Sequence, residues 1–232
     1  MKFGVVVFPG SNCDQDMYHV LKNVMGQDTV KLWHKSRDLE GCHFIVLPGG
    51  FSYGDYLRCG AIARFSPIME SVLQHASRGG YVLGVCNGFQ ILTEAQLVPG
   101  ALLRNAGQKF ICRNQYIKPA TSNSIMTANL NLNKAYKIPI AHAEGRYFAN
   151  EDTLKMLQDN DQVLFYYSNE AAQVGAQYNP NQSSLHIAGV MNKGRNVFGM
   201  MPHPERAADT MLNNTDGRAI FESILQHVVQ IA

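Results

Sequence analysis

The stretch Tyr81-Val82-Leu83-Gly84-Val85-Cys86-Asn87-Gly88-Phe89-Gln90-Ile91-Leu92 decides the fold of this 232-residue chain. Its apolar start predicts a buried strand and its end predicts a helix, so Cys86 lies at the sharp turn between them. A glycine two positions before and after a nucleophile is the pattern of a nucleophile elbow. The chain crowds itself there, and Gly84 and Gly88 fit because neither carries a Cβ. We expect Cys86 to be strained and to lie above a sheet, at the positive end of the helix.

The same pentapeptide is compatible with a purely structural role. Free cysteine is among the most buried residue types, so the alternative is an inert Cys86 inside a tight strand-to-helix turn. A catalytic thiol needs a base or acid within hydrogen-bond reach, and that group is usually oriented by a third. Residues elsewhere in the chain therefore decide between the two interpretations.

Short apolar segments alternate with longer amphipathic ones through the first hundred residues. Near-continuous apolar strands that alternate with helices pair in parallel, with right-handed crossovers. We therefore predict an α/β fold: a doubly wound, open, mostly parallel sheet with helices on both faces. Catalytic groups in such sheets lie beyond the carboxyl ends of the strands. The pattern predicts strands at 3–8, 29–33, 43–47 and 81–85 and helices at 14–25 and 67–78.

The second half of the chain is less regular. Residues 102–140 predict antiparallel extensions of the sheet, and Asn192-Lys193-Gly194-Arg195-Asn196 predicts a hairpin between strands 187–191 and 197–201. We also expect a helix at 152–158, a strand at 163–167 and a last helix at 217–229. No linker divides the chain, so the sequence predicts a single domain over 1–232.

Composition narrows the function classes. Hydrophobic residues make up 46% and charged residues 16%, which predicts a compact core. The net charge of +2 carries no basic stripe, which argues against nucleic-acid binding. No apolar run approaches the ~18 residues that span a membrane. The five cysteines lack metal-ligand spacing, so we expect no metal site and a reducing, cytoplasmic environment.

The segment Met200-Met201-Pro202-His203-Pro204-Glu205-Arg206 offers the acid and base that Cys86 needs. A spacing of two places His203 and Glu205 on one side of an extended segment. The carboxylate can then fix the tautomer of the imidazole while its other nitrogen faces the sulfur. The alternative is a rigid, proline-rich loop with a surface histidine and glutamate. His142 also precedes a glutamate by two positions, and could line a pocket or a partner surface.

The segment Pro48-Gly49-Gly50-Phe51 supplies a candidate oxyanion hole. Acyl transfer needs backbone N–H groups aimed at the developing oxyanion. The N–H of Gly50 or Phe51, together with that of Asn87, would form such a pair. The alternative is an ordinary turn between a strand and a helix. Cys13 also lies near a helix start, but it has no flanking glycines and Asp14 opposes a thiolate, so we rank it far below Cys86.

Several of these segments together resemble a known family. Cys86-Asn87-Gly88-Phe89-Gln90 resembles the Cys-x-Gly-x-Gln motif of the class I (triad) glutamine amidotransferases, and His203-Pro204-Glu205 resembles their His-Pro-Glu motif. The blocks 9–14, 49–58, 142–147 and 200–206 are similar to the glutaminase subunits of this family in purine biosynthesis. The resemblance covers nearly the full length of the chain.

The resemblance implies a reaction and a set of partners. Cys86 would attack the side-chain amide of glutamine, His203 and Glu205 would complete the triad, and Gln90 would help to hold the substrate. A γ-glutamyl thioester would then be hydrolysed, and the ammonia would pass to a separate synthetase subunit. ATP and Mg²⁺ would belong to that partner, with no cofactor on this chain. Split enzymes of this kind also have a small third subunit.

Two other functions compete with this interpretation. One is a free-standing γ-glutamyl hydrolase, or another thiol hydrolase of the same fold, which would act without partners. The block Phe51-Ser52-Tyr53-Gly54-Asp55-Tyr56-Leu57-Arg58 argues against it, because it matches the subunits. The other is a non-catalytic binding or scaffolding subunit, which the intact set of Cys86, His203 and Glu205 disfavours.

Overall fold

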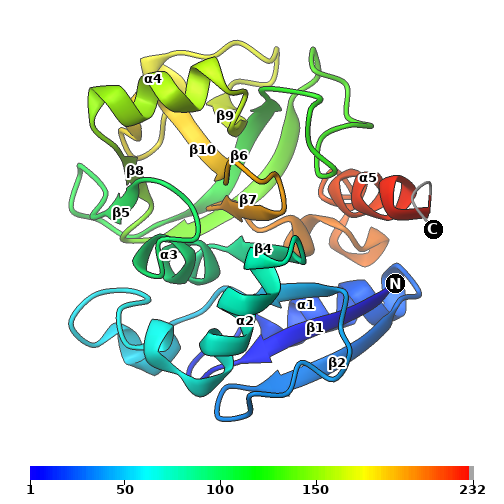
Figure 1. The fold of residues 1–232 in the computed structure, drawn as a ribbon. Coiled ribbons are helices and arrows are strands. Elements are labelled where there is room, and N and C mark those ends of the chain that lie inside the picture. The colour runs from blue at the N-terminus through cyan, green and yellow to red at the C-terminus, as the bar shows by residue number, and fades with distance from the viewer. Residues whose placement is uncertain (230–232) are drawn as a thin grey trace.

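The computed structural model describes residues 1–229, which form an α/β fold around one large sheet (Figure 1). The first five strands in the order below pair in parallel and the pairs beyond are antiparallel, which confirms the predicted fold class. Among the described residues the sheet has nine strands, in the order β2 (Asp28–Trp33), β1 (Lys2–Val7), β3 (Phe44–Leu47), β4 (Tyr81–Val85), β11 (Val197–Met200), β10 (Ile187–Met191), β9 (Val163–Ser168), β6 (Ile111–Pro119) and β7 (Tyr136–His142).

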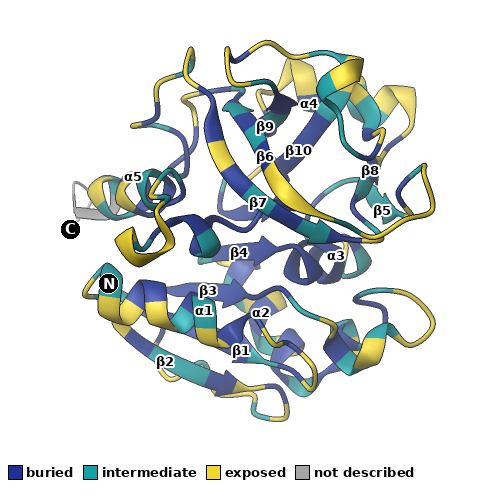
Figure 2. Ribbon diagram, turned by 180° about the vertical axis from the view of Figure 1, so that it is seen from behind, coloured by how far each residue is buried: buried dark blue, intermediate teal, exposed yellow. Residues whose placement is uncertain are grey.

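Helices cover both faces of the parallel half. Figures 1 and 2, which view the molecule from opposite sides, show α2 (Pro67–Ser77) in front of the sheet and α1 (Asp14–His19) behind it. The predicted helix over 14–25 divides in two, because a π-helical turn follows α1 at Val20–Val24. There the N–H of Met25 donates to the carbonyl of Val20, five residues earlier, at 2.8 Å. The predicted start of α2 at Pro67 is confirmed.

The antiparallel half carries the predicted hairpin and extensions. β10 and β11 form the hairpin, and β6 pairs with both β7 and β9. A separate two-stranded sheet joins β5 (Ala101–Leu103) to β8 (Arg146–Phe148), and the sequence pattern missed β8. Two α-helices belong to the second half of the chain, α4 (Glu151–Asp159) and α5 (Arg218–Val229). β7 lies against the short 3-10 turn Pro204–Ala207, where the N–H of His203 donates to the carbonyl of Pro139 at 2.8 Å.

The helix α3 (Asn87–Glu94) lies at the centre of the molecule, between the two halves (Figure 1). It packs against β3, β4 and β11, and its residues from Asn87 to Thr93 are all buried. Enclosure on every side fixes the start of this helix and therefore the position of Cys86.

The continuous sheet supports the proposal that the chain forms one domain; residues 230–232 of the predicted 1–232 lie outside the described part. Within that part, no helix combines the length and apolar character needed to cross a bilayer. All five thiols are free.

Candidate active site

Cys86 occupies the sharp turn that the sequence predicts. β4 ends one residue before it and α3 begins one residue after it, and its backbone has φ 50° and ψ −106°. A Cβ on Gly84 would lie 2.5 Å from the carbonyl oxygen of Gly88, and a Cβ on Gly88 would overlap the carbonyl oxygen of Leu47 in β3. Both glycines are therefore required, and the strain at Cys86 is held by its surroundings.

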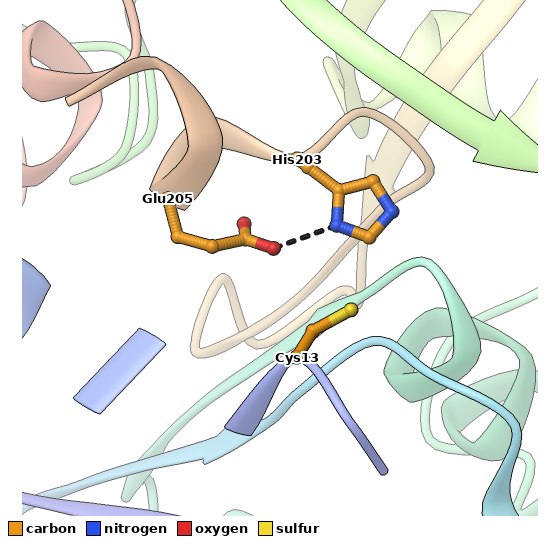
Figure 3. Close-up of side chains that lie close together, drawn as sticks. All are labelled: Cys13, His203 and Glu205. Atoms are coloured by element: carbon orange, nitrogen blue, oxygen red, sulfur yellow. Dashed lines mark hydrogen bonds and ion pairs between the residues drawn. The ribbon is translucent and has the colours of Figure 1, made fainter. Parts of the chain in front are cut away.

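His203 and Glu205 form a buried pair at the end of β11 (Figure 3). Nδ1 of His203 lies 2.6 Å from Oε1 of Glu205, and both side chains are almost completely buried. The prediction of an extended segment here is wrong. Pro204 begins a 3-10 turn, and this turn brings the carboxylate of Glu205 back to the imidazole. The pairing forms as expected, although the backbone reaches it by a different route.

Charge around His203 favours the imidazolium. Burial disfavours the charged form, but the Glu205 carboxylate, and after it the Cys86 sulfur, hold the pKa of His203 well above its usual range. Nε2, the nitrogen turned away from Glu205, has no hydrogen-bond partner among the described residues. This nitrogen is available to exchange a proton with a sulfur or a substrate, and an imidazolium near a thiol is the arrangement that activates a Cys–His pair.

The candidate oxyanion donors differ in availability. In the described part of the chain, the N–H groups of Gly50 and Asn87 donate to no protein acceptor. The N–H of Phe51 instead donates to the carbonyl of Gly10 at 2.8 Å. Gly50 and Asn87 are therefore available in this conformation, whereas Phe51, the alternative to Gly50, would have to release Gly10 before it could serve.

Gln90 is held at both ends of its amide. Nε2 donates to the carbonyl of Glu144 at 2.6 Å, and Oε1 accepts from Nδ2 of Asn87 at 2.9 Å. These bonds tie the start of α3 to the turn after β7. Cys86 meets the same strand, since its sulfur lies 3.6 Å from the carbonyl of Ala141.

His142 is buried, so the suggestion that it forms a partner surface is wrong. Its Nδ1 lies 3.0 Å from Oδ1 of Asn105, while Nδ2 of that asparagine donates to the carbonyls of Lys109 and His142. Oδ1 also accepts from the N–H of Gly145, so Nδ1 of His142 must be the donor. Burial, and then the charge on His203, lower the pKa of His142 to about 4, which keeps it neutral.

Cys13 lies beside the pair, which the sequence interpretation did not expect. Its sulfur, a nitrogen of His203 and a carboxylate oxygen of Glu205 come within 4.8 Å of one another (Figure 3). These atoms could in principle hold a metal ion, but Nη2 of Arg206 lies 3.0 Å from the sulfur and its positive charge opposes a cation. The signal in the sequence was position: the loop after β1 ends at the same edge of the sheet.

Comparisons with known proteins identify relatives of this chain. A family described as the CobB/CobQ-like glutamine amidotransferase domain matches residues 1–226. A phosphoribosylformylglycinamidine synthase subunit PurQ from Trichormus variabilis is 51% identical over the whole of both chains. Another PurQ, from Synechocystis sp., is 54% identical over 95% of this chain and 99% of its own.

Solved structures show the same architecture. A chain of the structure described as PurLQS from Thermotoga maritima matches with a TM-score of 0.86 and 39% identity, over 98% of each chain. The glutaminase domain of Trypanosoma brucei CTPS, solved with bound acivicin, has a TM-score of 0.61 at 13% identity, over 97% of this chain and 94% of its own. The second likeness supports the fold alone.

Proposed function

This chain belongs to the CobB/CobQ-like glutamine amidotransferase family, and from that membership we propose that it is the glutaminase subunit of a phosphoribosylformylglycinamidine synthase. It hydrolyses glutamine to glutamate and ammonia, which the synthase uses to aminate formylglycinamide ribonucleotide in purine biosynthesis. The observation that carries the assignment of residues is the buried pair of His203 and Glu205, 2.6 Å apart and electrostatically coupled to the strained Cys86.

The site suits acyl transfer through a thioester. The Cys86 sulfur attacks the side-chain carbonyl carbon of glutamine, and the N–H groups of Gly50 and Asn87 stabilise the oxyanion. His203 gives its Nε2 proton to the departing nitrogen, so that ammonia leaves and a γ-glutamyl thioester remains. His203 then takes a proton from water, which cleaves the thioester to glutamate and the free thiol. Glu205 orients the imidazole and stabilises its charge throughout.

We assign the remaining chemistry to partner subunits. The relatives are named as one subunit of the synthase, and the Thermotoga maritima structure is described as PurLQS. The partners we propose are therefore a PurL-type synthetase and a small PurS-type subunit, with ATP and Mg²⁺ on the synthetase. Five free thiols are consistent with a reducing compartment, and we propose the cytoplasm.

The burial of Cys86 and the occupied N–H of Phe51 imply that a partner controls the activity of the site. Cys86 is 5% exposed, and the N–H of Phe51 is occupied by Gly10. The segment that follows carries large exposed apolar side chains, which are typical of an interaction surface: Phe51, Tyr56, Leu57 and Phe65. A synthetase that docks there would reach the peptide next to the proposed oxyanion hole.

We expect the isolated chain to release glutamate about 10²–10³-fold more slowly than the assembled complex, the effect of one further oxyanion donor, which docking would supply by releasing the N–H of Phe51 from Gly10. The measurement is glutamate release with and without the synthetase, its small subunit, ATP and formylglycinamide ribonucleotide. An isolated chain as fast as the complex would instead support the free-standing thiol hydrolase. Acid-quenched complex should carry a γ-glutamyl adduct on the Cys86 peptide, and an adduct on another residue would refute the proposed nucleophile.

Replacement of the orienting carboxylate tests the pair directly. A Glu205→Gln variant should lose about 10²–10⁴-fold in kcat for glutamine, because an amide no longer enforces the tautomer or stabilises the imidazolium. Glu205 raises the pKa of His203, so its loss lowers that pKa and moves the alkaline limb of the activity profile to lower pH. The matched control is Glu151→Gln, at the exposed start of α4, which should change neither. A Glu205→Gln variant with normal kcat would contradict the role.

A further inference from the structure

Cys13 lies in the wall of the site and has no role in the mechanism above. It immediately precedes α1 and is 3% exposed. Figure 3 shows its sulfur beside the imidazole ring of His203, which is hydrogen-bonded to Glu205. A buried sulfur within 4.8 Å of a ring nitrogen of His203 and a carboxylate oxygen of Glu205 can influence the orientation of the ring.

Arg206 holds this sulfur in place. Nη2 donates to Sγ of Cys13 at 3.0 Å, and Nε donates to Oδ2 of Asp16 at 3.1 Å. Asp16 lies in the first turn of α1, whereas Arg206 lies in the same 3-10 turn as Glu205. One guanidinium therefore fastens the N-terminal helix to the turn that carries the catalytic carboxylate.

Gly49 leaves room for the sulfur and the ring to meet. A Cβ at this position would lie 2.7 Å from Cε1 of His203 and 3.2 Å from the sulfur of Cys13. The N–H of Cys13 donates to the carbonyl of Gly49 at 3.3 Å. The backbone of one loop and the thiol of another therefore lie together against this side of the ring.

We propose that Cys13 and Arg206 act as one positioning unit, anchored on Asp16, which holds the imidazole of His203 with Nε2 presented to Cys86. This inference rests on the proposed function, because it assigns a role in the same proton transfer. Neither residue is required to touch glutamine, and the unit acts on the reaction only through His203.

The charges around His203 predict in which direction the pH profile shifts when the Cys13 sulfur is removed. Burial lowers the pKa of His203, Glu205 and then Cys86 raise it, and contact with Cys13 adds a smaller rise. Removal of the Cys13 sulfur should therefore lower that pKa and shift the alkaline limb of activity to lower pH. The titratable and charged groups nearest to the ring and its carboxylate are Glu205, Cys86, Cys13, His142 and Arg206. Asp16, His19 and Asp209 line a cavity that Glu205 and Arg206 also line.

The test uses a Cys13→Ala variant in the assembled synthase. We expect kcat with glutamine to fall about 10-fold, a part of the 10²–10⁴-fold that a well-positioned acid–base group contributes. KM for glutamine should stay within about twofold, since such a loss removes no ground-state contact to the substrate. The alkaline limb should move to lower pH, and Cys13→Ser, which keeps a hydrogen-bonding atom, should recover most of the rate. Cys42→Ala, a buried thiol in another part of the core, is the matched control and should leave the pH profile unchanged.

Two further measurements keep the test decisive. Ammonium-dependent synthesis should stay normal in Cys13→Ala, which shows that the complex is intact. If that variant does not assemble, Arg206→Lys, which keeps the charge but not the two-point contact, should give the same losses. The double variant should be no slower than the worse single one if the two residues act as a unit. A normal kcat and pH profile, or additive losses, would overturn the inference, whereas glutamine use by a variant without Cys86 would overturn the proposed function instead.

Discussion

A Cys86→Ala variant, assembled with its synthetase partner, should lose glutamine-dependent synthesis by roughly 10⁵-fold or more, because the thioester cannot form. Synthesis supported by added ammonium salt should remain at the level of the unchanged complex. The synthetase takes only ammonia from this chain, so the steps that use ammonia do not depend on Cys86. The measurement is amidine formation with glutamine or with ammonium chloride as the only nitrogen source.

The control for this experiment is Cys112→Ala, because Cys112 is exposed and its thiol is free. Both activities should be normal in that variant. Glutamine use retained by Cys86→Ala would remove Cys86 from its catalytic role. Loss of both activities would show that the alanine damages the complex, and would support the structural interpretation of the elbow.

The parts of the site that the sequence predicts correctly depend on local spacing. The glycines on either side of Cys86 predict the elbow because a side chain at either position would collide within the turn or with the neighbouring strand. His203 and Glu205 are predicted as partners because they lie two positions apart, although a 3-10 turn and not an extended segment brings them together. Parallel strands ending in loops likewise indicate the edge of the sheet where these groups meet.

The parts that the sequence misses depend on contacts between distant segments. Cys13 and Arg206 are separated by 193 positions, and although both follow strands that end at one edge of the sheet, no local spacing indicates that they touch. The bond from Phe51 to Gly10 also joins two loops, so the pattern that suggests an oxyanion donor cannot show that the donor is occupied. His142 shares its spacing to a glutamate with His203, yet burial and Asn105 give it a different state. Tertiary packing decides these features.

A Gly88→Ala variant should lose roughly 3 kcal/mol of unfolding free energy, against the usual trend for glycine in a helix. Alanine in a helix normally gains up to about 1 kcal/mol over glycine. At this position the new methyl group overlaps the carbonyl oxygen of Leu47, and the backbone of a central strand cannot move aside. For a chain of this length the loss corresponds to a Tm about 6–12 °C lower in a thermal melt. Gly107→Ala is the matched control, because a Cβ there meets nothing within 4 Å and should leave Tm nearly unchanged. Equal melting temperatures for the two variants would show that α3 can shift away from β3, and that the position of Cys86 is not fixed by this contact.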